Sequence, residues 1–198
     1  KKVFDNPQHM ISHNGSNYYI VFFAPQKIHV ETVKQQIKEI ADKLSKKLEK
    51  YSVKFCIGVG SYYPGLAGLR KSYKEAVKAI QIVERKSPGQ LPQIIFAQDL
   101  SLEMMLAAAP DDIVGIFKNQ VLTKESAEVF LNDKKLLNTL RAFFASNLNI
   151  SKTAEELNVT RNTVSARLDK IKELTGLTPT DFNDAVKLKV LLTAIDVK

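Results

Sequence analysis

The residues best suited to chemistry lie in one short stretch of the sequence, LNVTRNTVSARLDKI, which runs from Leu157 to Ile171. Its middle part opens with four polar residues, TRNT, and becomes apolar only at Val164, Leu168 and Ile171. These apolar positions recur at i, i+4 and i+7, which is the spacing of one buried face of a helix. A helix that buries its later turns and presents hydrogen-bonding side chains at its start is suited to contacting a polar partner.

The outward side of this predicted helix carries groups that match the edges of DNA bases. At about 100° per residue, Asn162 and Ala166 lie nearly opposite Val164, with Ser165 beside them. Asparagine can make two hydrogen bonds to adenine, serine can donate or accept, and an alanine methyl fits against thymine. Basic and hydroxyl side chains around them suit phosphates. The candidate DNA-binding residues are Lys152, Thr160, Arg161, Asn162, Thr163, Ser165, Ala166, Arg167 and Lys170.

A second, shorter helix and a tight turn are predicted just before this one. Ser151 is the predicted N-cap of the shorter helix, and Ala154 is small where the two helices must approach closely. Asn158 is expected in the turn, because asparagine tolerates a left-handed conformation. Thr160 can cap the next helix and Gly176 can end it. Helix, short turn and helix is the geometry of one class of DNA-binding motif; the alternative is a plain helical bundle with a solvated polar tip.

The elements that must position this motif fall into two kinds. Apolar runs at residues 17–24, 53–60 and 93–97 predict strands. They alternate with two amphipathic helices, one starting at Val30 and one with its apolar face at Leu69, Tyr73, Ala76, Val77, Ile80 and Val83. Residues 99–133 predict two or three short helices broken at Pro110 and Gly115. The sequence thus predicts an α+β domain over 1–98, a helical connector over 99–133 and an all-helical domain over 134–198.

Composition sets further bounds on the class of protein. The net charge is +8, but residues 1–100 hold 16 basic and 8 acidic side chains, so the charge is not concentrated near the candidate motif. The lone Cys56 excludes an intramolecular disulfide framework. No apolar run is long enough for a membrane helix, and KKVFDNPQHM is not typical of a signal peptide. A cytoplasmic location and no membrane partner are expected.

Two stretches resemble a known family. The segment LLNTLRAFFASNLNISKTAEELNVTRNTVSARLDKIKELTGL is similar to the C-terminal helix-turn-helix of PucR/CdaR bacterial transcriptional regulators, and GVGSYYPGLAGLRKSYKEAVKAI resembles their central, degenerate GGDEF-like domain. The resemblance implies a cyclase-like α+β domain, incomplete at its start, followed by a DNA-binding domain. It also implies double-stranded DNA as partner, a homodimer, and a small-molecule effector acting through an N-terminal sensor domain. Family members commonly have a histidine at the position of Thr160 and an aromatic residue at the position of Ala166. Because both positions lie on the predicted DNA-binding face, the operator sequence of this chain cannot be inferred from those of its relatives.

The cyclase-like half is predicted to be catalytically dead. In the cyclase fold a hairpin carries acidic residues that hold Mg²⁺, whereas the matching HNGSNYYIVFF keeps Gly15 but has Ser16 and Asn17 in their place. No catalytic residue, cofactor or metal site is expected. The histidines His9, His13 and His29 have only Asp5 and Glu31 near them in sequence and are expected at the surface. The glycines Gly58, Gly60, Gly65 and Gly68 are expected to form a tight strand-to-helix turn. The alternative is a ligand- or nucleotide-sensing protein whose helical tail makes protein contacts, which guanine-nucleotide binding at the hairpin would favour.

Overall fold

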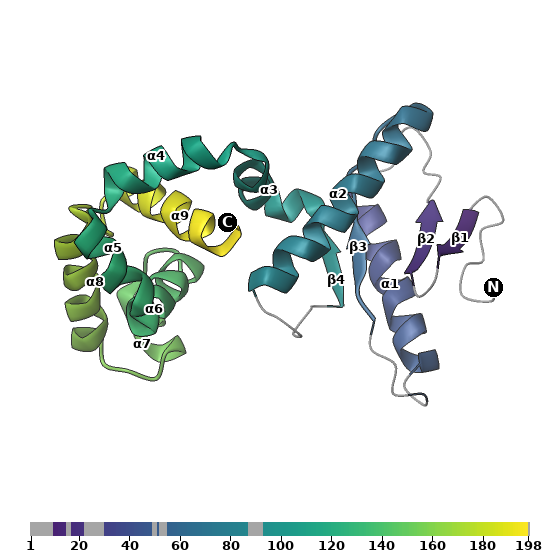
Figure 1. Ribbon diagram of the computed structural model, residues 1–198. Coiled ribbons are helices and arrows are strands. Elements are labelled where there is room, and N and C mark those ends of the chain that lie inside the picture. Colours follow the sequence, from purple (N-terminus) through teal and green to yellow (C-terminus); the bar gives the residue numbers. More distant parts are fainter. Residues whose placement is uncertain are drawn as a thin grey trace. The chain divides into compact units, whose positions relative to one another are not determined.

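The computed structural model describes residues 10–14, 17–21, 30–48, 51, 55–86 and 93–197. The chain divides into two compact units, Lys1–Leu100 and Ser101–Lys198 (Figure 1). Short strands occur in the first unit, and the described part of the second unit is entirely helical. Among the described residues, no helix is both long and apolar enough to cross a membrane.

The described residues of the first unit form two small sheets and two long helices (Figure 1). Strands β1 and β2 form an antiparallel hairpin in which Met10 lies opposite Val21. Strands β3 and β4 are parallel, with Ile57 opposite Ile94, and α2 packs on both of them. The elements are β1 (Met10–Asn14), β2 (Asn17–Val21), α1 (Val30–Leu48), β3 (Ile57–Val59), α2 (Gly65–Lys86), β4 (Ile94–Phe96) and the 3-10 helix η2 (Ala97–Leu100).

Helix α2 buries only part of the face that was predicted. Its buried residues are Gly68, Ala79 and Ile82, whereas Leu69 and Tyr73 are 39% and 47% exposed. The prediction was wrong at Leu69 and Tyr73, whereas the other four residues of the predicted face are half-buried. Helix α2 approaches its neighbours partly through the small residues Gly68 and Ala79, and apolar periodicity gives small residues little weight. At Gly68 an added Cβ would lie 2.5 Å from the Tyr63 carbonyl oxygen.

The turn from β3 into α2 confirms the predicted role of the glycines. An added Cβ on Gly60 would lie 1.9 Å from the Ser72 carbonyl oxygen, so only glycine fits there. Ser61 N donates to Glu75 Oε2 at 3.0 Å, and the Tyr63 hydroxyl donates to the same carboxylate. Burial would raise the pKa of Glu75, but the hydrogen bonds from Tyr63 and Ser61 outweigh it and lower that pKa. Several residues of the segment that resembles the GGDEF-like domain therefore serve to hold this turn in place.

The second unit is a helical bundle around one core. Phe130, Leu140, Phe143, Ile171, Leu188 and Leu191 are almost completely buried and join α5, α6, α8 and α9. The helices are α3 (Ser101–Ala108), α4 (Asp111–Val121), α5 (Lys124–Asn132), α6 (Lys134–Ala145), α7 (Ile150–Glu156), α8 (Arg161–Thr175) and α9 (Phe182–Val197).

The segment predicted as a connector forms α3, α4 and α5. Pro110 lies between α3 and α4 as predicted, but Gly115 lies inside α4 and does not break it, because an isolated glycine costs a helix only about 1 kcal/mol. Helix α3 packs on α9, and α5 packs on α8. These helices thus lie in the same compact unit as the helix-turn-helix region, and a separate connector with boundaries at 98 and 133 stays a prediction.

Candidate nucleic-acid interface

Helix α7 begins earlier than its sequence suggested. Asn149, not Ser151, is the N-cap: its side chain accepts a hydrogen bond from Lys152 N at 3.0 Å. The chain reaches Asn149 through a tight turn in which Asn147 and Leu148 have φ values of 53° and 60°. Because this turn leaves Asn149 extended, with φ −99° and ψ 106°, the helix starts at the next residue and Ser151 lies inside it.

The turn between α7 and α8 has the predicted left-handed residue. Asn158 has φ 52°, Val159 N donates to Ala154 O at 2.9 Å, and Asn158 N donates to Glu155 O at 3.1 Å. This pair of bonds is the Schellman motif, which satisfies carbonyls at the helix end and reverses the chain. Ala154 is only 4% exposed, which confirms a small residue at the close approach. The turn thereby fixes where α8 starts relative to α7.

Replacing Asn158 tests this turn. Asn158→Gly is expected to keep the free energy of unfolding, because glycine adopts positive φ freely. Asn158→Ala is expected to lower it by about 1 kcal/mol, because alanine keeps the Cβ that strains the left-handed conformation but loses the short polar side chain that offsets this strain in asparagine. Urea unfolding followed by circular dichroism measures both, with Asn119→Ala, at an exposed site in α4, as the control. Equal stability of the two Asn158 variants would contradict the turn's role.

Helix α8 is capped and anchored as its sequence predicted. Thr160 Oγ1 accepts from Thr163 N at 3.1 Å, and Gly176 ends the helix with φ 71°. Val164, Leu168 and Ile171 are at most 4% exposed and confirm the predicted buried face. Since both ends and one side of α8 are fixed, its polar first turn is presented in a defined orientation.

The structure divides the nine candidate DNA-binding residues into three groups. Thr163, Ser165 and Arg167 are half-buried. Lys170 is exposed but lies 2.9 Å from Glu173 Oε2, and such a surface pair holds a side chain only weakly. The remaining members are exposed, namely Lys152, Thr160, Arg161, Asn162 and Ala166.

Arg167 has a role that the sequence did not indicate. Its Nη1 donates to Thr139 Oγ1 at 3.1 Å, and Thr139 is fully buried in α6. The Thr139 hydroxyl in turn donates to Lys135 O at 2.7 Å. Arg167 therefore links α8 to α6 and helps to orient the helix. The only signal for this role in the sequence is a threonine within the apolar face of α6.

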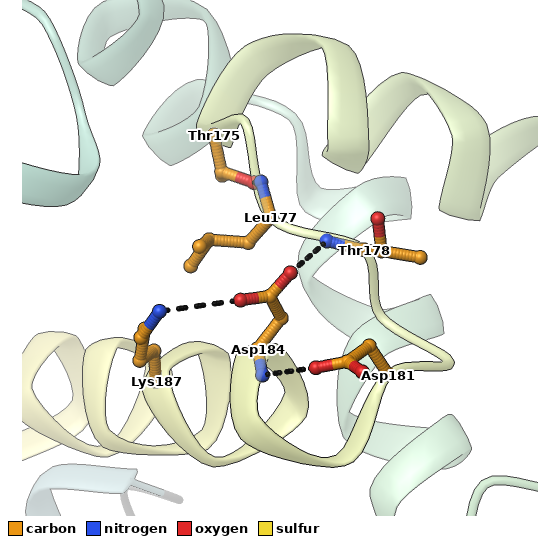
Figure 2. A network of polar contacts seen from close by, with 6 residues as sticks. All are labelled: Thr175, Leu177, Thr178, Asp181, Asp184 and Lys187. Atoms are coloured by element: carbon orange, nitrogen blue, oxygen red, sulfur yellow. Dashed lines mark hydrogen bonds and ion pairs between the residues drawn. The ribbon is translucent and has the colours of Figure 1, made fainter.

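The loop after α8 is held by a polar network (Figure 2). Thr178 N donates to Asp184 Oδ2 at 3.0 Å, and Asp184 N donates to Asp181 Oδ1 at 3.1 Å. Lys187 Nζ lies 3.2 Å from Asp184 Oδ1. The hydrogen bond from Thr178, assisted by Lys187, lowers the pKa of Asp184. This carboxylate joins the end of α8 to the start of α9.

Asp184→Asn is expected to lower the melting temperature at neutral pH and to make it less pH-dependent. Because the pKa of Asp184 is lowered by folding, its contribution is complete above the ordinary aspartate pKa and is lost as the pH falls through the folded value. The difference in melting temperature between the two proteins should therefore shrink on acidification. Thermal unfolding from neutral pH to strongly acidic pH measures it; a constant difference would contradict this role.

No group of three or more His, Cys, Asp or Glu residues suited to a metal ion occurs in the described part of the chain. His9, His29 and Asp5 lie outside the described residues, as do Gly15 and Ser16 of the predicted hairpin turn. The expected lack of a metal site and of cyclase chemistry in this half therefore stays a prediction.

Two family models match the chain. Residues 136–194 match the PucR C-terminal helix-turn-helix domain, and residues 3–82 match a GGDEF-like domain. The chain is 34% identical over 131 residues to the uncharacterized protein YsfB of Bacillus subtilis strain 168, which covers 66% of this chain and 33% of that protein. It is 29% identical over 157 residues to the carbohydrate diacid regulator of Escherichia coli K12, covering 78% of this chain and 39% of the relative.

A third relative is also named as a regulatory protein. The purine catabolism regulatory protein of Bacillus subtilis strain 168 is 30% identical over 135 residues, which is 68% of this chain and 25% of that protein. The chain thus spans between a quarter and two fifths of the length of these three relatives.

Proposed function

The chain belongs to the PucR/CdaR family of transcriptional regulators, and from that premise we propose that it regulates transcription by binding double-stranded DNA through α8. The observation that carries the proposal is the exposed first turn of a helix that is capped at both ends and buried along one side. Such a helix can enter the major groove with its N-terminal residues against base edges.

Each exposed residue has a specific part in this proposal. Asn162 recognises adenine through two hydrogen bonds, and Ala166 lies against a thymine methyl. Arg161 and Lys170 bind phosphates, and Lys152, at the start of α7, holds the backbone across the groove. Half-buried Thr163 and Ser165 offer hydroxyls at the edge of this surface, as does exposed Thr160, whereas Arg167 acts mainly by orienting α8 through Thr139.

The protein is proposed to act as a homodimer without enzymatic activity, in the cytoplasm. One helix-turn-helix makes few contacts, and two of them placed about 34–36 Å apart would recognise a roughly palindromic site. The GGDEF-like unit would dimerise or relay a signal from a small-molecule effector. Light scattering that finds only monomer, both alone and with DNA, would contradict the dimer.

The test of the proposed function is fluorescence anisotropy with duplex DNA from upstream of the protein's own operon and with a scrambled duplex, at two salt concentrations. Preference for the upstream duplex is expected at both. Equal, weak and salt-sensitive binding to the two duplexes would mean that α8 does not recognise sequence, and would favour the ligand-sensing alternative.

Lys170→Ala is expected to weaken binding to the upstream and scrambled duplexes by the same factor. A phosphate contact carries no sequence information, so the slope of log K against log salt should fall by about one unit. Salt titrations of the variant and the parent measure this slope. The control is Lys172→Ala, in the last turn of the same helix, which should leave the slope unchanged. A change confined to the upstream duplex would contradict the assignment to phosphate.

A further inference from the structure

Helix α2 in the first unit has one side on which every charged residue is basic. At about 100° per residue, an arc of about 100° on this side holds five charged residues, all of them basic, together with Ala67 and Gln81. All five are exposed except half-buried Lys78. We define the basic stripe as Arg70, Lys71, Lys74, Lys78 and Arg85.

The acidic residues of α2 lie outside the basic stripe. The Glu75 carboxylate is turned toward Ser61 and Tyr63, from which it accepts hydrogen bonds. Lys71 Nζ lies 4.0 Å from the centre of the Tyr63 ring, so this contact holds one end of the stripe. Arg70, Lys74 and Lys78 follow at intervals of four residues with no acidic side chain between them on this side.

An ordinary solvated helix face looks different, and α1 supplies the comparison. Its exposed lysines Lys38, Lys43 and Lys47 are interleaved with exposed Glu31, Glu39 and Asp42. In α2, by contrast, like charges four residues apart repel one another and destabilise the helix. A partner that neutralises them would offset this repulsion. From Arg70 to Arg85 the stripe rises about 22 Å, and Arg70, Lys74 and Lys78 follow one another about 6 Å apart along the axis.

We propose that the basic stripe of α2 contacts the phosphate backbone of duplex DNA, as a second binding surface separate from α8. The inference rests on the proposed function, since it assumes that DNA is the partner. Duplex DNA is a regular polyanion, and a line of cations can contact its phosphates whatever the base sequence. The stripe thus adds affinity for any duplex, and α8 adds the preference among duplexes.

The experiment is a salt titration of the full chain with a scrambled duplex, followed by fluorescence anisotropy. The triple variant Arg70→Gln, Lys74→Gln, Lys78→Gln is expected to bind about tenfold more weakly and to lose about 2 to 3 units of salt slope. The matched control, Lys38→Gln, Lys43→Gln, Lys47→Gln on α1, removes the same charge and should keep the parent's slope. Lys74→Gln alone, which changes one exposed side chain, should lose about one unit.

Two results would overturn the proposal. An unchanged salt slope in the α2 variants would mean that the basic stripe does not contact DNA and binds another anionic partner. Equal losses of salt slope in the α1 and α2 triple variants would mean that only the net charge of the chain matters. Failure of the proposed function is distinguishable. The α2 triple should keep the preference for upstream over scrambled DNA. A chain without any such preference refutes recognition by α8, while the slope still tests the stripe.

Discussion

Replacing Arg161 and Asn162 together by alanine is expected to reduce the preference for the upstream duplex over a scrambled one by about 1–3 kcal/mol and to weaken binding to both duplexes, while much of the salt-dependent binding persists. Both residues lie in the exposed first turn of α8, where the capped helix presents them without burial. Loss of a bidentate contact from Asn162 to adenine costs about 1–3 kcal/mol of discrimination, and loss of Arg161 removes a neighbouring phosphate contact. The loss of preference should therefore match that of Asn162→Ala alone, whereas the affinity for both duplexes should fall further than in either single variant.

The measurement is anisotropy with both duplexes at one salt concentration, for the parent and the double variant. Asn119→Ala with Lys124→Ala is the matched control, because it also removes one amide and one positive charge from exposed sites. The control should retain the preference. A double variant that discriminates as well as the parent would show that the first turn of α8 does not contact bases.

Phe143→Ala is expected to lower the free energy of unfolding of the second unit by about 3–5 kcal/mol. Phe143 is completely buried in α6, in the core that also contains Leu140 and Ile171. Removing the ring leaves a cavity under the face on which α8 rests. Since a small domain is stable by only about 5–15 kcal/mol, this change removes a large share of the unit's stability, and DNA binding should be lost at a lower temperature than in the parent.

Urea unfolding followed by circular dichroism tests this expectation. Phe182→Ala makes the same chemical change at the start of α9, where the side chain is 73% exposed, and should alter stability by less than about 0.5 kcal/mol. If the two phenylalanine variants were equally stable, the core described here would be wrong.

Local backbone chemistry made part of the candidate site predictable from the sequence. Asn158 and Gly176 occupy left-handed positions that few other residues tolerate, and Thr160 caps the helix between them. The apolar spacing of Val164, Leu168 and Ile171 then determined which side of α8 is buried. These signals lie within a few residues of the structure they specify, so they can be recognised without knowledge of the tertiary fold.

Features that depend on distant parts of the chain were missed. The link from Arg167 to Thr139 joins residues 28 positions apart in sequence, and no local pattern pairs them. In α2, close approach through Gly68 and Ala79 rotated the buried face away from Leu69 and Tyr73. At α7, the tight turn at Asn147 moved the N-cap from Ser151 to Asn149. The first two errors arose where tertiary packing decides the conformation, whereas the error at α7 came from an adjacent turn that was not recognised in the sequence.

The most direct test of sequence recognition is selection of duplexes by the full chain from a library of random sequence. The proposed function predicts enrichment of one motif, with two related half-sites about one helical turn apart if the dimer forms. Selection with the Asn162→Ala variant should then lose an adenine preference at one position of each half-site. Enrichment of no motif above the starting library would contradict the claim that α8 recognises DNA sequence.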